Sequence, residues 1–188
     1  GDLDASTLLL KRAIALGSDA DAHFLMGKVL ARQKKNNDAL DQFVQASKIE
    51  PKYPRIGQHL GMALYRLKRY EEAAKLLSRE FEQTRDIGIY YFIGRSMVEL
   101  RKPNRAAVIF QTIVSNQPTH AMARFGLARL LDADGQAAKA RGHYKAFLKL
   151  ARKVDELADQ VRHAQSRVQE IEESGELGAA KGKRGKRR

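Results

Sequence analysis

Histidines and carboxylates are the side chains of this chain that could take part in metal binding or proton transfer. The five histidines are His23, His59, His120, His143 and His163. No two of them stand at metal-ligand spacing with a carboxylate partner, as a zinc or acid-base site would require. The chain has no cysteine, which excludes disulfides, thiolate catalysis and zinc–thiolate sites.

Two further patterns could be mistaken for binding motifs. Asp132 and Asp134 precede Gly135 as in the start of a calcium loop, but Gln136-Ala137-Ala138 supplies no further carboxylate. The glycines Gly182 and Gly185 lie in a basic segment and follow no predicted strand, so they form no phosphate-binding loop. The sequence therefore predicts a protein that is not an enzyme and holds no cofactor and no metal.

The net charge is a second source of possible chemistry. The chain has 35 lysines and arginines against 22 aspartates and glutamates, for a formal charge of +13. The final residues, 175–188, have few apolar side chains, and we expect them to form a disordered basic tail. Six tail cations could contact nucleic acid or another anionic surface, or could only solvate the chain end. They are Lys181, Lys183, Arg184, Lys186, Arg187 and Arg188.

The elements that position these residues follow from a repeat in the sequence. Glycines recur 34 and 33 residues apart, each followed twelve residues later by an alanine. The pairs are Gly27/Ala39, Gly61/Ala73 and Gly94/Ala106, with Ala128/Ala140 in the same phase. A period of this length is typical of stacked helical hairpins.

The other positions of the repeat indicate how each hairpin packs. Glycine inside a helix costs about 1 kcal/mol relative to alanine, so its recurrence predicts close contact between paired helices. A large apolar residue follows each alanine by four positions: Phe43, Leu77, Phe110 and Tyr144. All four prolines fall in predicted turns or at predicted helix starts: Pro51, Pro54, Pro103 and Pro118.

This pattern resembles the tetratricopeptide repeat family. The resemblance implies an all-α fold, an α-solenoid of stacked antiparallel helix hairpins in a right-handed superhelix. Four repeats are expected within residues 20–153, at about 20–53, 54–86, 87–120 and 121–154. Residues 1–19 would hold the second helix of a partial repeat, and residues 154–174 a C-terminal helix.

The C-terminal helix has its own apolar stripe. Its members alternate spacings of three and four residues: Val154, Leu157, Val161, Ala164, Val168 and Ile171. Such a stripe covers the exposed end of a repeat stack or pairs with another chain in a coiled coil. We favour the cap, and with it a monomer, because the flanking residues offer no charge complementarity.

The resemblance also implies where a partner would bind. In this family the first helix of each hairpin lines a concave groove that holds a peptide. The side chains carried to that groove here combine cations with aromatic rings. They are Phe24, Lys28, Arg32, Arg55, His59, Tyr65, Arg66, Tyr91, Phe92, Arg95, Phe125 and Arg129.

These features predict a non-catalytic scaffold for protein–protein interaction that binds an acidic or mixed acidic and apolar segment of a partner. The alternative is a helical repeat protein that binds nucleic acid through the basic groove and tail. No apolar run is long enough for a membrane span. The composition favours a cytoplasmic protein, although Gly1 is also compatible with removal of a targeting segment.

Overall fold

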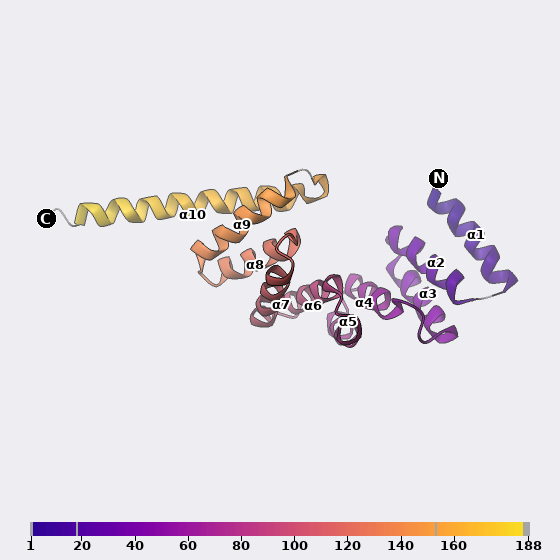
Figure 1. The fold of residues 1–188 in the computed structure, drawn as a ribbon. Helices are drawn as coiled ribbons and strands as arrows, with labels where there is room; N and C mark the ends of the chain where they lie inside the picture. Colours follow the sequence, from indigo (N-terminus) through magenta and orange to yellow (C-terminus); the bar gives the residue numbers. More distant parts are fainter. Residues whose placement is uncertain (1, 18, 153, 186–188) are drawn as a thin grey trace. The chain divides into compact units, whose positions relative to one another are not determined.

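The computed structural model describes the backbone of residues 2–17, 19–152 and 154–185, and the side chains of residues 5–17, 19–152 and 154–175. Every regular element in these residues is helical, and they contain no strand (Figure 1). The elements are α1 (Asp2–Leu16), α2 (Ala20–Arg32), α3 (Asn36–Ile49), α4 (Ile56–Arg66), α5 (Tyr70–Thr84), α6 (Ile87–Glu99), α7 (Pro103–Asn116), α8 (Ala121–Ala133), α9 (Ala137–Ala151), the short 3₁₀ helix η1 (Asp155–Leu157) and α10 (Ala158–Gly185). Each of the four predicted repeat spans thus holds two helices.

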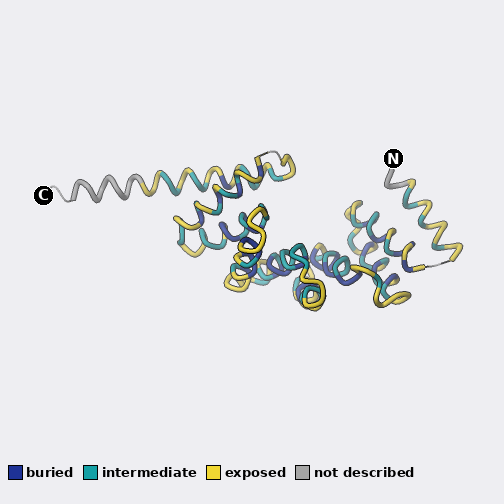
Figure 2. Tube along the Cα trace, in the orientation of Figure 1, coloured by how far each residue is buried: buried dark blue, intermediate teal, exposed yellow. Residues whose placement is uncertain are grey.

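The chain divides into two compact units, Gly1–Arg101 and Lys102–Arg188. In the first unit, α2 pairs with α3 and α4 with α5 as hairpins, α1 packs against α2, and α6 packs against α5. In the second unit, α8 and α9 form a hairpin that α7 and α10 flank. Helices α2 to α9 each combine buried residues with exposed ones (Figure 2). This confirms the predicted all-α fold of helical hairpins. None of the described helices is long and apolar enough to cross a membrane.

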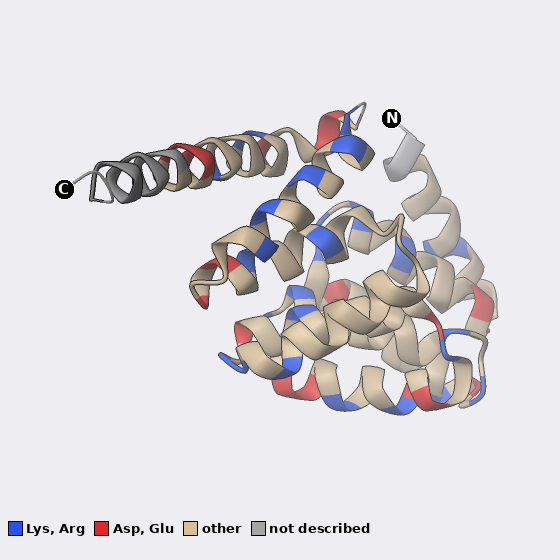
Figure 3. Cartoon of the chain, turned by 60° about the vertical axis from the view of Figure 1, so that its left-hand side comes forward, with Lys and Arg blue, Asp and Glu red and all other residues tan. Residues whose placement is uncertain are grey.

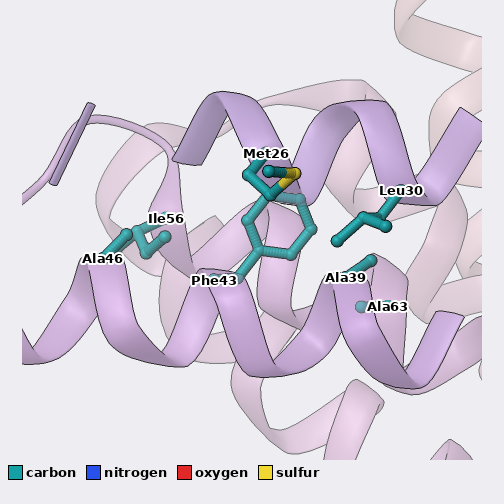
Figure 4. Close-up of a cluster of buried hydrophobic side chains, with 7 residues drawn as sticks. All are labelled: Met26, Leu30, Ala39, Phe43, Ala46, Ile56 and Ala63. Carbon is teal, nitrogen blue, oxygen red and sulfur yellow. The ribbon is translucent and has the colours of Figure 1, made fainter. Parts of the chain in front are cut away.

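The core of the first hairpin shows why the glycines recur. Phe43 on α3 is buried at the centre of a cluster with Met26, Leu30, Ala39, Ala46, Ile56 and Ala63 (Figure 4). A β-carbon added to Gly27 would lie 2.6 Å from the Phe43 ring. In the next hairpin, a β-carbon on Gly61 would lie 2.5 Å from Leu77, which is fully buried. Gly27 and Gly61 therefore mark close helix contact, as the sequence predicted.

The turn that ends the first helix of each repeat is built in one way. Lys34, Lys68, Arg101 and Gly135 all have positive φ, between 54° and 75°. In three of these turns the next amide donates to a carbonyl five residues back, as from Lys35 to Leu30 (2.9 Å). This is the Schellman motif, whose left-handed position usually belongs to glycine.

Helices α2 and α6 begin with an aspartate side-chain cap, and α7 begins with proline. The carboxylate of Asp19 accepts a hydrogen bond from the amide of Ala22 (2.6 Å), and the carboxylate of Asp86 caps α6 through the amide of Gly88 (2.7 Å). Such caps satisfy amides that have no partner within the helix. Pro103 occupies the first turn of α7, where its missing N–H costs nothing.

The second unit has a core of its own. Ala128, Ala140, Tyr144, Phe147 and Ala151 are buried between α8 and α9, together with Phe125. On the facing side of α8, a β-carbon added to Gly126 would lie 2.7 Å from the ring of Phe110 on α7. The large residue four positions after the alanine thus again meets a small residue of a neighbouring helix.

Helix α10 lies against this core. Ala164 is fully buried, and Leu157, Val161 and Val168 pack on the same cluster. The Arg167 guanidinium binds both oxygens of Asp132 on α8, at 2.8 and 2.9 Å. On α9, the ammonium of Lys145 lies 2.5 Å from the carboxylate of Glu172. The predicted stripe therefore faces the core of α8 and α9 through Leu157, Val161, Ala164 and Val168, whereas Val154 is 40% exposed.

The C-terminal boundary differs from the sequence expectation. The expected helix ends at residue 174, whereas α10 continues to Gly185 without a break. The side chains of all six tail cations fall outside the part of the chain whose side chains the structure describes. The disorder of residues 175–188 in solution and their contact with polyanions stay predictions.

Candidate peptide-binding surface

Four of the predicted groove residues surround one pocket in the first unit. Lys28 and Arg32 come from α2, and His59 and Arg66 from α4. The pocket has a volume of about 170 Å³. We call it the cationic pocket; its lining is Lys28, Ala31, Arg32, Phe43, His59, Met62 and Arg66.

Helical spacing explains why these side chains meet. Lys28 and Arg32 are four residues apart and therefore lie one above the other on α2. His59, Met62 and Arg66 follow at spacings of three and four along α4. Because each hairpin contributes the same phase of its first helix, packing of the two hairpins brings these two rows together.

The cationic pocket has one sign of charge. Its lining includes one lysine, two arginines and one histidine, and no carboxylate. Burial, followed by the charges of Lys28, Arg55 and Arg66, lowers the pKa of His59 below its ordinary value of 6.5. The imidazole is therefore neutral at pH 7, beside three permanent cations. Such a pocket suits an anionic group.

Aromatic rings border the cationic pocket on α2. The Phe24 ring contacts the rings of Tyr53, His59 and Phe43, with centroids 4.7, 4.8 and 5.8 Å away. The ammonium of Lys28 lies 5.6 Å from the Phe24 centroid. These contacts fix the orientation of Phe24 and hold the Lys28 side chain over its face.

A hydrogen bond holds the outer edge of this aromatic group. The hydroxyl of Tyr53 donates to Asp21 at 2.5 Å. This bond, with burial and the charge of Asp21, raises the pKa of Tyr53 to about 12. Tyr53 therefore stays protonated throughout the physiological range and keeps Asp21 turned toward it.

The remaining predicted groove residues of the first unit lie elsewhere. Arg95 places its guanidinium 4.8 Å from the ring centroid of Tyr65 and about 6 Å from those of Tyr91 and Phe92. Tyr65 is only 9% exposed and belongs to the core between α4 and α5. Arg95 thus covers an aromatic cluster and does not line the cationic pocket.

Arg55 has a backbone role in addition to its charge. It precedes α4 with a left-handed backbone (φ 62°), and its carbonyl accepts the amide of His59 at 3.1 Å. Its side chain is exposed and is not part of the lining. Its charge still reaches the pocket, since it contributes to the lowered pKa of His59.

Phe125 was expected in the groove, and this expectation is corrected by the structure. Phe125 is 8% exposed and packs against Phe147, His163 and Tyr144, with centroids 5.0, 5.7 and 6.1 Å away. Its ring is covered because α10 places His163 over it. Phe125 therefore stabilises the second unit and offers no surface to a ligand.

Arg129 lies at a second pocket, of about 300 Å³, in the second unit. Asp132, Tyr144, His163 and Arg167 share that lining. The hydrogen bonds from Arg167 lower the pKa of Asp132, while burial and Asp132 raise the pKa of Tyr144 to about 12. Here a carboxylate already has a cationic partner from α10, so this pocket is less suited to an acidic ligand than the cationic pocket.

Sequence reasoning missed one wall of the cationic pocket. Phe43 was assigned only to packing within the hairpin, where it does contact Gly27. Its ring also lies 5.2 Å from that of His59 and lines the pocket. No spacing rule distinguishes these roles, because a buried ring can pack with one edge and line a pocket with the other.

The described residues contain no group of three or more His, Asp or Glu side chains that could hold a metal ion. His23 is buried and hydrogen-bonds through Nδ1 to the Gln42 side chain at 2.7 Å, joining α2 to α3. Basic residues occur on helices and turns of both units (Figure 3).

Two family models, both described as tetratricopeptide repeat, match residues 30–87 and 93–154. Human tetratricopeptide repeat protein 16 is 26% identical over 150 residues, which cover 75% of this chain and 17% of that protein. The chain spans only 8% to 60% of the length of the curated relatives it matches.

Solved structures share the fold at low sequence identity. A double mutant of MamA RS-1 has a TM-score of 0.74 at 20% identity, covering 83% of this chain and 89% of that one. YrrB, described as a TPR protein with an unusual peptide-binding site, has a TM-score of 0.63 at 16% identity, covering 93% and 97%.

Proposed function

The chain belongs to the tetratricopeptide repeat family, whose repeats form scaffolds for protein–protein interaction, and we propose that it holds an acidic segment of a partner protein in the cationic pocket. The observation that supports this proposal is the lining itself. Lys28, Arg32 and Arg66 meet beside a half-buried His59 with no carboxylate among them. A peptide carboxylate would offset their mutual repulsion.

The apolar parts of the pocket argue for a mixed segment. Met62 and Phe43 line it, and the Phe24 ring lies beside the Lys28 ammonium. A ligand with an apolar side chain next to its acidic one would bury that side chain on these surfaces. Cations would then govern the rate of encounter, and the apolar contact would govern how long the complex lasts.

The nucleic-acid alternative has less support from the same geometry. Binding of single strands uses open aromatic faces on which bases stack. Phe24 is packed against three rings, and Tyr65 is buried beneath Arg95. We therefore expect single-stranded nucleic acid to bind more weakly than an acidic peptide.

The test uses three fluorescent probes and measures anisotropy on titration with the whole chain. The acidic probe is a short peptide of aspartate, glutamate and leucine, the neutral probe replaces its acids with asparagine and glutamine, and the third is single-stranded oligouridine. The proposal expects saturable binding of the acidic probe that weakens with salt, and at least about tenfold weaker binding of the neutral probe. Equal binding of both peptides, or oligouridine displacing the acidic probe at lower concentration, would refute the proposal.

The lowered pKa of His59 predicts a dependence of binding on pH. In the free protein the imidazole is neutral at pH 7, because burial and three cations oppose its protonation. A bound carboxylate favours the protonated form, so binding takes up a proton as the pH falls toward the pKa of the imidazole in the complex. We expect the affinity for the acidic probe to rise about threefold between pH 7 and pH 5.5. The His59→Gln variant should lose that rise, and a rise that persists in this variant would assign it to another group.

A further inference from the structure

Helix α8 begins with a histidine cap. The imidazole of His120 accepts a hydrogen bond from the backbone amide of Ala123 through Nδ1, at 3.2 Å. This amide is one of those at a helix start that have no partner within the helix. The caps of α2 and α6 are carboxylates, which keep an acceptor oxygen whether or not they are protonated. An imidazole nitrogen, in contrast, can lose its acceptor role near neutral pH.

The cap requires the neutral form of His120. Because Nδ1 accepts, the proton of the neutral ring lies on Nε2. Protonation would place an N–H on Nδ1, directed at the amide of Ala123, so the hydrogen bond would be lost. The imidazolium charge would also lie at the positive end of the α8 dipole, where a cation is unfavourable.

The turn between α7 and α8 is held to the start of α8 at the same place. The amide of His120 donates to the carbonyl of Gln117, the residue that ends α7, at 3.0 Å. Arg124 donates from its guanidinium to the carbonyl of Pro118 at 2.6 Å and from its backbone to the carbonyl of His120 at 3.2 Å. The His120 cap is thus part of a small set of contacts that join the turn to α8.

A second histidine opposes positive charge in this region. The Nδ1 atom of His143 on α9 is buried and has no hydrogen-bond partner among the described residues. Burial, followed by the charge of Arg124, lowers the pKa of His143 below its ordinary value of 6.5. Burial, partly offset by a backbone hydrogen bond, lowers the pKa of His120 below the same value. Both rings are therefore neutral at pH 7.

The neighbouring helices supply no carboxylate that would favour the charged rings. Helix α7 has no titratable side chain after Arg105, and α9 has no carboxylate. The carboxylate of α8, Asp132, lies about three turns beyond His120. The exposed acids at the start of the C-terminal helical segment contribute to neither histidine pKa: Asp155, Glu156 and Asp159.

From these contacts we propose that the start of α8 is an acid-sensitive hinge, in which protonation of His120 releases the cap on Ala123 and loosens the α7–α8 turn. Since the pKa of His120 is lower in the folded chain, its contribution to stability is complete above 6.5 and is lost as the pH falls through the folded value. The hinge goes beyond the proposed function, because it lies in the second unit and involves no residue of the cationic pocket.

Hydrogen exchange of the Ala123 amide measures the hinge directly. Protection factors remove the pH dependence of the intrinsic exchange rate. We expect the protection factor of Ala123 to fall at least about fivefold between pH 7 and pH 5, as the loss of a helix cap implies. The amide of Ala22 is the internal reference, since it is bound by the carboxylate of Asp19, and its protection factor should change less than about twofold.

Variants separate His120 from the other titrating groups. Asparagine is a good helix cap that does not titrate, so His120→Asn should keep the protection factor of Ala123 within about twofold from pH 7 to pH 5. His143→Gln should leave the fall at Ala123 in place. His59→Gln, which removes the expected pH dependence of peptide binding, should also leave it in place, so the hinge and the proposed function fail independently.

Three results would overturn the hinge. The first is a protection factor of Ala123 that does not change with pH in the wild type. The second is a fall that persists in His120→Asn or disappears in His143→Gln. The third is a proton on Nδ1 of His120 at pH 7, which nitrogen NMR detects from the chemical shift of that atom.

Discussion

Replacing Gly61 with leucine should lower the free energy of unfolding by about 3 kcal/mol, at the upper end of the usual cost of overpacking. The β-carbon alone would lie 2.5 Å from two carbons of Leu77. Leu77 is fully buried on α5, so it has little room to move, and α4 and α5 would have to separate. Denaturant unfolding followed by circular dichroism measures the change.

The matched control is Gly142→Leu. Gly142 is also within a helix, α9, but it is exposed, and a β-carbon there would meet nothing within 4 Å. Because leucine is the better helix former by somewhat under 1 kcal/mol, this variant should be as stable as the wild type or slightly more so. If Gly61→Leu and Gly142→Leu unfold at the same denaturant concentration, Gly61 does not mark close contact between α4 and α5.

Reversing two charges of the cationic pocket should nearly abolish binding of the acidic probe. The Lys28→Glu, Arg66→Glu double variant places two carboxylates where the ligand carboxylate would lie, so attraction becomes repulsion. We expect the dissociation constant to rise about 100-fold or more. The salt dependence of the remaining binding should also fall, since fewer cations contribute to it.

The control variant changes the net charge equally at a distance from the pocket. Lys75 and Arg79 are both exposed on α5 and do not line the cationic pocket. The Lys75→Glu, Arg79→Glu variant should bind the acidic probe within about threefold of the wild type. A comparable loss in both double variants would mean that the overall charge, and not the pocket, attracts the peptide.

The repeat pattern was sufficient to predict the local packing. Phe43 and Leu77 were identified by their spacing from the alanines, and each meets the glycine of its partner helix. Because each of these hairpins needs a small residue opposite a large one, both residue types recur at the repeat period in the sequence. The same periodicity brought Arg32 and Arg66 to one phase of successive first helices, and the structure places them at one pocket.

Burial and side-chain direction could not be predicted in this way. Phase gives the side of a helix but not what covers it, so Phe125 was assigned to the groove although α10 and α9 enclose it. Arg95 has the phase of Lys28, one position after the repeat glycine, yet its guanidinium lies over the ring of Tyr65.

The left-handed turns at the ends of α2, α4, α6 and α8 bear on how far this protein could be stabilised by engineering. Gly135 adopts its positive φ without steric cost, whereas Lys34, Lys68 and Arg101 adopt it against a penalty of about 1–2 kcal/mol each. Glycine would remove that penalty but add freedom to the unfolded chain, for a net gain of up to about 1 kcal/mol per site. In three of the four repeats a residue with a β-carbon therefore adopts a strained backbone conformation at this turn, whereas the fourth repeat has glycine there. Glycine at these three exposed turn positions should therefore raise the stability of the chain without disturbing the core or the cationic pocket.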